Sequence, residues 1–138
     1  MEMLDEFVAP KDSIVYSLCK YVVEEIQRLL NGCNDLEMGD IAGLGKKMYG
    51  THQCLSKLYE VSCKVADFLV DAVKNNPAVL GARMMGGGFG GCTISIVQED
   101  AIIEMVETVA AKYKATMGLE LSVYISNIEN GTEVIKVG

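Results

Sequence analysis

The chain has 138 residues, of which half are hydrophobic and 22% are charged, a composition that excludes a disordered segment and is typical of one compact domain. Its net charge is −7 and its 12 basic residues form no cluster, which argues against nucleic acid or a membrane surface as a partner. The five cysteines include no C-x-x-C pair and only one histidine is present, so we expect neither disulfides nor an intrinsic metal site. The cysteine pattern also predicts a reduced, cytoplasmic setting, and because no apolar run reaches membrane-spanning length, no membrane span is expected.

The first part of the sequence predicts two helices. Apolar residues recur every three or four positions after Asp12 or Ser13, either of which can be the N-cap, and Asn31-Gly32 is the expected stop. After a short polar segment, a second helix is expected over residues 41–59, although three glycines weaken it.

The middle of the chain changes from a helical to an extended pattern. Ser62 is expected to cap a third helix, which ends before Pro77 because the residue preceding a proline avoids the helical region. Residues 79–85 and 92–97 then predict two strands joined by a glycine-rich loop.

The last part of the sequence predicts one more helix and a hairpin. Asp100 is the expected N-cap of the helix and Gly118 its stop. Apolar and polar residues alternate over 119–126, and Asn130-Gly131 is expected to turn the chain into a final strand at 133–137.

Early helices and late antiparallel strands together predict an α+β fold. We expect a ferredoxin-like arrangement, in which helices pack on one face of a four-stranded antiparallel sheet. No linker or internal repeat divides residues 1–138, so a single domain is predicted.

Glycines fill five of the six positions from Gly86 to Gly91. Without Cβ atoms, such a backbone can adopt positive φ angles and direct several N–H groups at one anion. A dinucleotide site is excluded because a strand rather than a helix follows, and a P-loop is excluded because Cys92-Thr93 replaces the required Lys-Ser/Thr. The motifs of protein kinases are also absent. The structural alternative is a hairpin connection that serves only tight packing.

Residues 81–93 read GARMMGGGFGGCT. This segment resembles the third signature of galactokinases, which are GHMP small-molecule kinases. The resemblance extends upstream through Glu60-Val61-Ser62-Cys63 and His52, and it covers most of residues 19–97.

The resemblance implies a two-domain enzyme that transfers the γ-phosphate of Mg-ATP to the anomeric hydroxyl of galactose, giving galactose 1-phosphate. This chain is similar to the carboxy-terminal domain only. In the family, the sugar signature, the main phosphate loop and the catalytic aspartate lie in an amino-terminal domain, to which no segment here is similar. We therefore expect no catalytic residue in this chain, no activity from it alone, and ATP and magnesium bound mainly by the absent domain.

The same resemblance assigns a substrate- and nucleotide-phosphate loop to Gly86, Gly87, Gly88, Gly90 and Gly91. Their backbone N–H groups are expected to close on the phosphates from the far side of the cleft. Phosphoryl transfer depends on such positioning and electrostatic support.

Arg83 and Met85 are secondary candidates beside this loop. Arg83 can attract phosphate or pair with an acidic side chain, and pairing is favoured because strand residues alternate faces. Met85 stands where the family usually has Thr, which removes a hydroxyl beside the loop. Phe89 is expected to pin the loop hydrophobically, and His52 to be packed and hydrogen-bonded rather than catalytic.

Two other functions remain open. The chain can be a free-standing ferredoxin-like module that binds a small anion or self-associates. It can also be the domain of a sibling GHMP kinase that acts on another sugar or alcohol. If the domain has lost a partner, we expect an exposed apolar face through which it self-associates.

Overall fold

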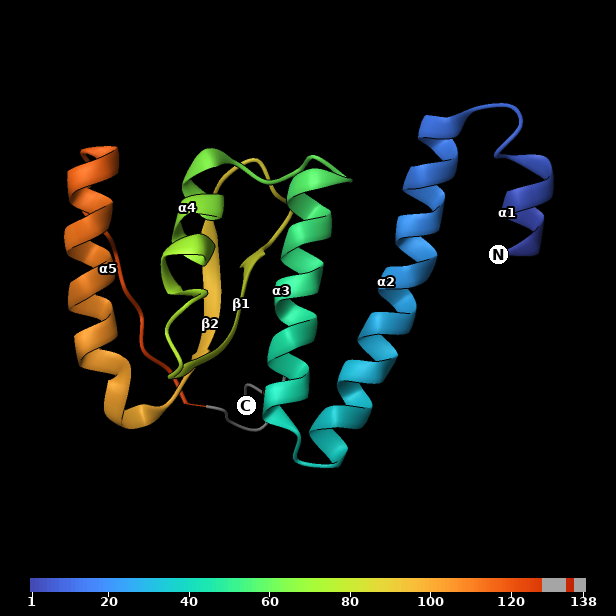
Figure 1. The fold of residues 1–138 in the computed structure, drawn as a ribbon. Coiled ribbons are helices and arrows are strands. Elements are labelled where there is room, and N and C mark those ends of the chain that lie inside the picture. Colours follow the sequence, from blue (N-terminus) through green and yellow to red (C-terminus); the bar gives the residue numbers. More distant parts are fainter. Residues whose placement is uncertain (128–133, 136–138) are drawn as a thin grey trace.

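The structure is a computed structural model that describes residues 1–127 and 134–135. Its elements, in chain order, are α1 (Glu2–Phe7), α2 (Ser13–Glu37), α3 (Ile41–Lys57), α4 (Lys64–Val73), β1 (Val79–Met85), β2 (Cys92–Val97), the short 3₁₀ helix η1 (Glu99–Ala101) and α5 (Ile102–Met117). Figure 1 shows α1 and α2 at one edge of the molecule, α3 between α2 and the strands, and α5 at the opposite edge.

Helix α2 begins where the sequence predicts, after Asp12, but it extends beyond the predicted end at Asn31-Gly32. The Asp12 side chain accepts hydrogen bonds from the N–H groups of Ile14 and Val15 and is the N-cap. The stop at Asn31-Gly32 is wrong, because Gly32 lies where α2 packs on α3 and a Cβ there would be 3.3 Å from Leu44 Cδ1. Gly39, with a φ of 73°, provides the left-handed turn that follows the helix.

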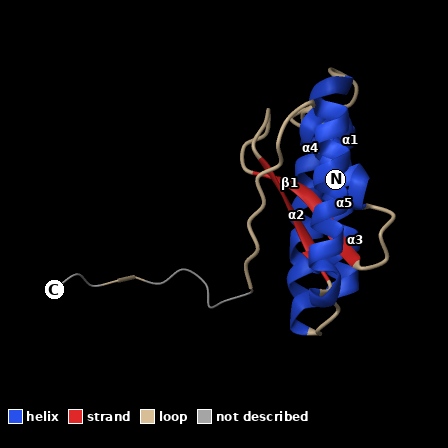
Figure 2. Cartoon of the chain, turned by 90° about the vertical axis from the view of Figure 1, so that its left-hand side faces the viewer, coloured by secondary structure: helices blue, strands red, loops and turns tan. Residues whose placement is uncertain are grey.

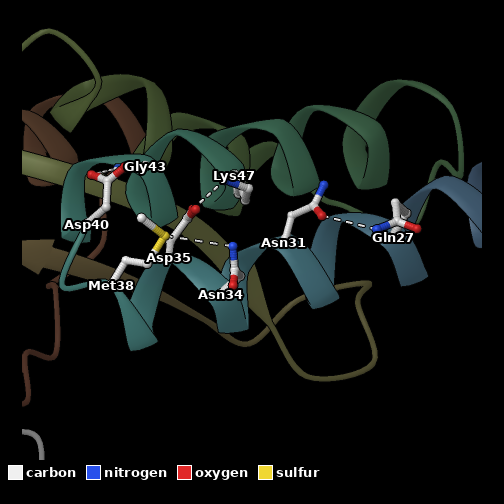
Figure 3. A network of polar contacts seen from close by, with 8 residues as sticks. All are labelled: Gln27, Asn31, Asn34, Asp35, Met38, Asp40, Gly43 and Lys47. Atoms are coloured by element: carbon white, nitrogen blue, oxygen red, sulfur yellow. Dashed lines mark hydrogen bonds and ion pairs between the residues drawn. The ribbon is translucent and has the colours of Figure 1, made fainter.

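Polar contacts hold the α2–α3 hairpin together (Figure 3). Lys47 of α3 forms an ion pair with Asp35 of α2, and the Asp40 carboxylate caps α3 by accepting a hydrogen bond from the N–H of Gly43 at 2.8 Å. The second predicted helix is thereby confirmed, and the capping residue and the ion pair together fix where it begins.

Glycines allow α3 to pack directly on the backbone of β1. A Cβ on Gly45 would lie 3.0 Å from the nitrogen of Gly81 and would overlap the carbonyl of Leu80. The register of the β1–β2 ladder shifts between Val79 and Gly81, which marks an irregularity at this crossing. Gly45 therefore serves close approach, although by propensity alone it weakens the helix.

The two strands form an antiparallel sheet in which Met85 pairs with Cys92. The buried core joins Val70 and Val73 of α4 to Val79 and Ala82 of β1 and to Val109 of α5. In Figure 2, the strands run obliquely past the helices, and the loop that joins them projects at one end of the sheet.

The expected third and fourth strands are not in this sheet. The structure assigns no strand to residues 119–127, although Leu121 packs against the core cluster. The turn at Asn130-Gly131 and most of the strand expected at 133–137 lie outside the described residues. An alternating pattern supplies a suitable face, but a strand also needs a hydrogen-bonding neighbour, so the prediction of four strands stays unconfirmed.

Two predicted caps are corrected. Helix α4 begins after Cys63 without a side-chain cap, and Ser62 Oγ instead donates a hydrogen bond to Asp67 Oδ1 at 2.6 Å. Helix α5 has Ala101 as its N-cap rather than Asp100, which lies in η1. Its predicted end is confirmed, since Gly118 has a φ of 68° and its N–H bonds to the carbonyl of Lys114.

Helix α2 exposes an apolar face. Its exposed side chains include Val22, Ile26, Leu29 and Leu30, of which Leu29 is 66% exposed. In Figure 1, α3 covers one side of α2, and α1 lies beside only its first part. Such a contiguous set of large apolar side chains marks a surface suited to packing against protein.

Candidate functional site

The glycine loop occupies backbone conformations that require glycine. Gly86, Gly88, Gly90 and Gly91 have φ angles of 85°, 90°, 141° and 100°. Phe89 also has a positive φ, of 59°, which is uncommon for a bulky side chain and stores local strain. The loop therefore uses the conformational freedom for which its composition is suited.

The loop is anchored through its backbone to the segment between α3 and α4. The N–H of Phe89 donates a hydrogen bond to the carbonyl of Val61 at 2.6 Å. A Cβ on Gly88 would lie 2.9 Å from Val61 Cβ and closer still to the Val61 carbonyl oxygen. The expected hydrophobic pin is wrong, because the Phe89 side chain is 78% exposed and only its backbone is held.

The remaining loop glycines face open space. A Cβ added at Gly86, Gly87, Gly90 or Gly91 would meet no atom within 4 Å. Among the residues that the structure describes, no hydrogen bond uses the N–H groups of these glycines or of Gly88. The loop thus presents a row of unpaired N–H donors, the arrangement that suits phosphate oxygens.

The two secondary candidates lie just before the loop. Arg83 forms no ion pair with another described residue, and its Nε donates instead to the carbonyl of Met84 at 3.0 Å. The predicted pairing with an acidic side chain is thus not found among the described residues and stays a prediction. Met85 ends β1 with its side chain 43% exposed.

A buried polar bridge lies behind the loop. His52 of α3 is buried, and its Nδ1 accepts a hydrogen bond from the N–H of Met84 at 3.2 Å. Its Nε2 lies 3.3 Å from Asp67 Oδ1 of α4, and Asp67 also accepts hydrogen bonds from Ser56 and Ser62. His52 is packed and hydrogen-bonded, as the sequence predicts.

The environment of the bridge favours neutral His52 and ionised Asp67. Burial lowers the pKa of His52 below its ordinary value of 6.5, against the opposing effect of Asp67 and Asp71. Burial alone would raise the pKa of Asp67, but hydrogen bonds from Ser62 and Ser56, with smaller electrostatic contributions from His52 and Lys57, together lower it. A cavity of about 160 Å³ beside this pair is lined in part by Lys57 and Lys74.

The described residues include no group of three or more His, Cys, Asp or Glu side chains placed to hold a metal ion. No helix in the described part of the chain is long and apolar enough to span a membrane. All five cysteines are free thiols.

Comparison with known proteins defines the family. A family model described as GHMP kinases C terminal matches residues 20–115. The chain belongs to this family. It is 41% identical over 124 residues to the galactokinase of Clostridium beijerinckii, and this match covers 90% of this chain and 32% of that protein. It is 37% identical over 116 residues to the galactokinase of Thermotoga petrophila, covering 84% and 33% of the two proteins.

A solved GHMP relative shares the fold. The crystal structure of Lactococcus lactis galactokinase complexed with galactose matches with a TM-score of 0.84 at 28% identity, covering 94% of this chain and 34% of that one. The α+β fold of the carboxy-terminal GHMP domain is thereby confirmed. The chain spans about a third of the length of the galactokinases it matches.

The glycine loop is visible in the sequence, but the groups that support it are harder to predict. The role of the Val61 carbonyl cannot be predicted from residue type, because every residue has a backbone acceptor. The single histidine and Ser62 are a signal for the bridge in the sequence, and the acid five residues after Ser62, Asp67, is the partner of both.

Proposed function

We propose that this chain is the carboxy-terminal domain of a galactokinase, which transfers the γ-phosphate of ATP to the anomeric hydroxyl of galactose and forms galactose 1-phosphate. The observation that carries the proposal is the loop from Gly86 to Gly91, with its unpaired N–H donors, in a domain whose relatives are galactokinases. The chain matches only about a third of the length of those relatives, so the activity is proposed for the full-length gene product.

The N–H groups of Gly86, Gly87, Gly88, Gly90 and Gly91 close on the phosphates of ATP and of the forming product. They supply orientation and electrostatic support as charge shifts between the oxygens of the transferring group. A Cβ added at Gly87 would point into open space, so a side chain at this position would block the approach of a ligand.

No side chain of this domain acts as the catalytic base or nucleophile in this proposal. Magnesium accompanies ATP, and its ligands belong mainly to the amino-terminal part of the enzyme. The loop is suited to contacting phosphate rather than the metal, because it offers N–H donors and no carboxylate, and Mg²⁺ prefers oxygen ligands. The domain alone is inactive because it holds only one side of the site.

The proposal also covers the complete domain and its partners. Residues 1–138 form one domain, in which a four-stranded sheet is completed by strands from the carboxy-terminal region. The amino-terminal part of the cytoplasmic enzyme and the substrates galactose and ATP are the partners. In the absence of that part, the domain self-associates through the apolar face of α2, where Leu29 is 66% exposed.

A sibling GHMP kinase that acts on another sugar or alcohol is the second candidate. Met85, where galactokinases usually have Thr, is the observation that favours it, since this exposed position adjoins the loop. A hydroxyl at 85 can donate to a phosphate or sugar oxygen, and a thioether cannot.

The test is ADP release by the full-length gene product with Mg-ATP, measured with galactose and with a panel of other sugars and small alcohols. Turnover that depends on galactose supports the proposal. Turnover only with another acceptor supports the sibling kinase. No turnover with any acceptor contradicts both and favours a module that binds a small anion without chemistry.

A further inference from the structure

We propose that His52 is the positioning residue of the glycine loop: it ties β1 just before the loop to the segment that holds Phe89. The inference rests on the proposed function of that loop. His52 is buried, and its polar contacts among the described residues are with Met84 and Asp67 rather than with a loop glycine, so it acts through the residues that it holds.

One connection of the bridge reaches the strand that enters the loop. The N–H of Met84 donates to His52 Nδ1 at 3.2 Å, two residues before Gly86. Met84 and His52 are only 2% and 6% exposed, so water does not replace this contact readily. The imidazole therefore fixes the position of the backbone at the end of β1, where the chain enters the loop.

The other connection reaches the far side of the loop. His52 Nε2 lies 3.3 Å from Asp67 Oδ1, and the same oxygen accepts a hydrogen bond from Ser62 Oγ at 2.6 Å. Ser62 follows Val61, whose carbonyl accepts the hydrogen bond from the N–H of Phe89. The strand that enters the loop and the carbonyl that holds its tip are thus connected through the His52 imidazole, the Asp67 carboxylate and the Ser62 hydroxyl.

This arrangement works only with a neutral imidazole. Because Nδ1 accepts from Met84, the proton of the neutral ring lies on Nε2, which faces Asp67. Protonation would place a second donor on Nδ1 against the N–H of Met84 and break the first connection. Asp67 and Asp71 of α4 favour that protonation, whereas Lys57 of α3 and Lys74 after α4 oppose it.

Two substitutions of His52 separate the two connections. In His52→Asn, the amide oxygen can take the place of Nδ1 and accept from Met84, but the side chain is too short to reach Asp67. In His52→Gln, the amide nitrogen can take the place of Nε2 and donate to Asp67, but the acceptor for Met84 is lost. We expect His52→Gln to lower kcat about tenfold with little change in the KM for galactose, because the loop acts on the transferring phosphate. His52→Asn should keep a larger part of kcat.

Two serines provide a matched control. Ser56 and Ser62 each donate one hydrogen bond to Asp67, at 2.8 Å and 2.6 Å, but only Ser62 adjoins Val61. Ser62→Ala should therefore lower kcat severalfold, and Ser56→Ala should leave kcat within twofold of the wild-type value. Thermal unfolding of each variant separates loss of folded protein from loss of positioning.

Hydrogen exchange tests the bridge without relying on activity. In the full-length gene product, peptides that contain residues 84–89 should exchange faster in His52→Gln, while peptides from α5 keep the wild-type rate. Failure of galactose turnover in the wild type would refute the proposed function and leave this exchange result standing. Unchanged exchange and kcat in His52→Gln, or equal loss of kcat in Ser56→Ala and Ser62→Ala, would overturn the positioning role.

Discussion

Alanine substitution at Gly88 perturbs the loop at the point where it meets Val61. Two costs add there. Alanine at a φ of 90° is strained by about 1–2 kcal/mol, as left-handed conformations of residues with a Cβ generally are. Its Cβ would lie 2.9 Å from Val61 Cβ, so the loop must move by about 0.6–1 Å to reach an ordinary carbon–carbon separation.

The loop can relieve both costs by leaving Val61. That movement breaks the hydrogen bond from Phe89, which is worth about 1 kcal/mol, so the loss of unfolding free energy should be about 1–2 kcal/mol rather than the full sum. The effect on turnover should be larger, at least tenfold in kcat, because displaced N–H donors no longer meet the phosphate.

Gly87 is the matched control for this prediction. It has no positive φ and no atom within 4 Å of an added Cβ, so Gly87→Ala should change the unfolding free energy by less than about 0.5 kcal/mol. Urea unfolding and steady-state turnover of the full-length gene product, measured for both variants, check the prediction. Wild-type kcat in Gly88→Ala, or equal destabilisation by the two substitutions, would refute the reasoning.

Three further predictions concern the scaffold. Gly45→Ala should lower the unfolding free energy by about 3 kcal/mol or more, because its Cβ overlaps the backbone of β1. Gly50→Ala, whose Cβ meets only the Arg28 side chain, at 3.4 Å, should be neutral or stabilising, and urea unfolding measures both. Because burial holds the pKa of folded His52 below 6.5, its contribution to stability is complete above about pH 6.5 and is lost as the pH falls through the lowered value. In thermal unfolding measured over a series of pH values, His52→Asn should not show this loss of stability at low pH. Leu29→Lys should shift the isolated 138-residue chain towards monomer in sedimentation velocity, and an unchanged distribution would exclude the α2 face as its contact.

Features set by local chemistry could be predicted from the sequence. Asp12 caps α2 and Gly118 ends α5 because capping depends on a few adjacent residues. The glycine loop was likewise predicted from composition, and its four glycines with positive φ follow from the same local freedom.

Features set by distant partners could not be predicted. Gly32 and Gly45 look like helix breakers, yet β1 approaches Gly45 too closely for a Cβ, and Leu44 of α3 leaves only a tight space beside Gly32. Asp100 and Ser62 have the residue types of caps, but their helices begin elsewhere. The exposed Phe89 side chain and the Arg83 contact with Met84 also depend on tertiary placement that no local pattern contains.

The central claim is that this domain supplies the phosphate-closing loop of a galactokinase. The most direct measurement is formation of galactose 1-phosphate from galactose and Mg-ATP by the full-length gene product, followed by phosphorus NMR, for the wild type, Gly87→Val and Ala111→Val. Valine at 87 fills the open approach to the loop, whereas Ala111→Val adds the same side chain to the exposed surface of α5. We predict product from the wild type and from Ala111→Val, and at least tenfold less from Gly87→Val with unchanged thermal stability. Absence of galactose 1-phosphate from the wild type, or equal rates from all three proteins, would contradict the claim.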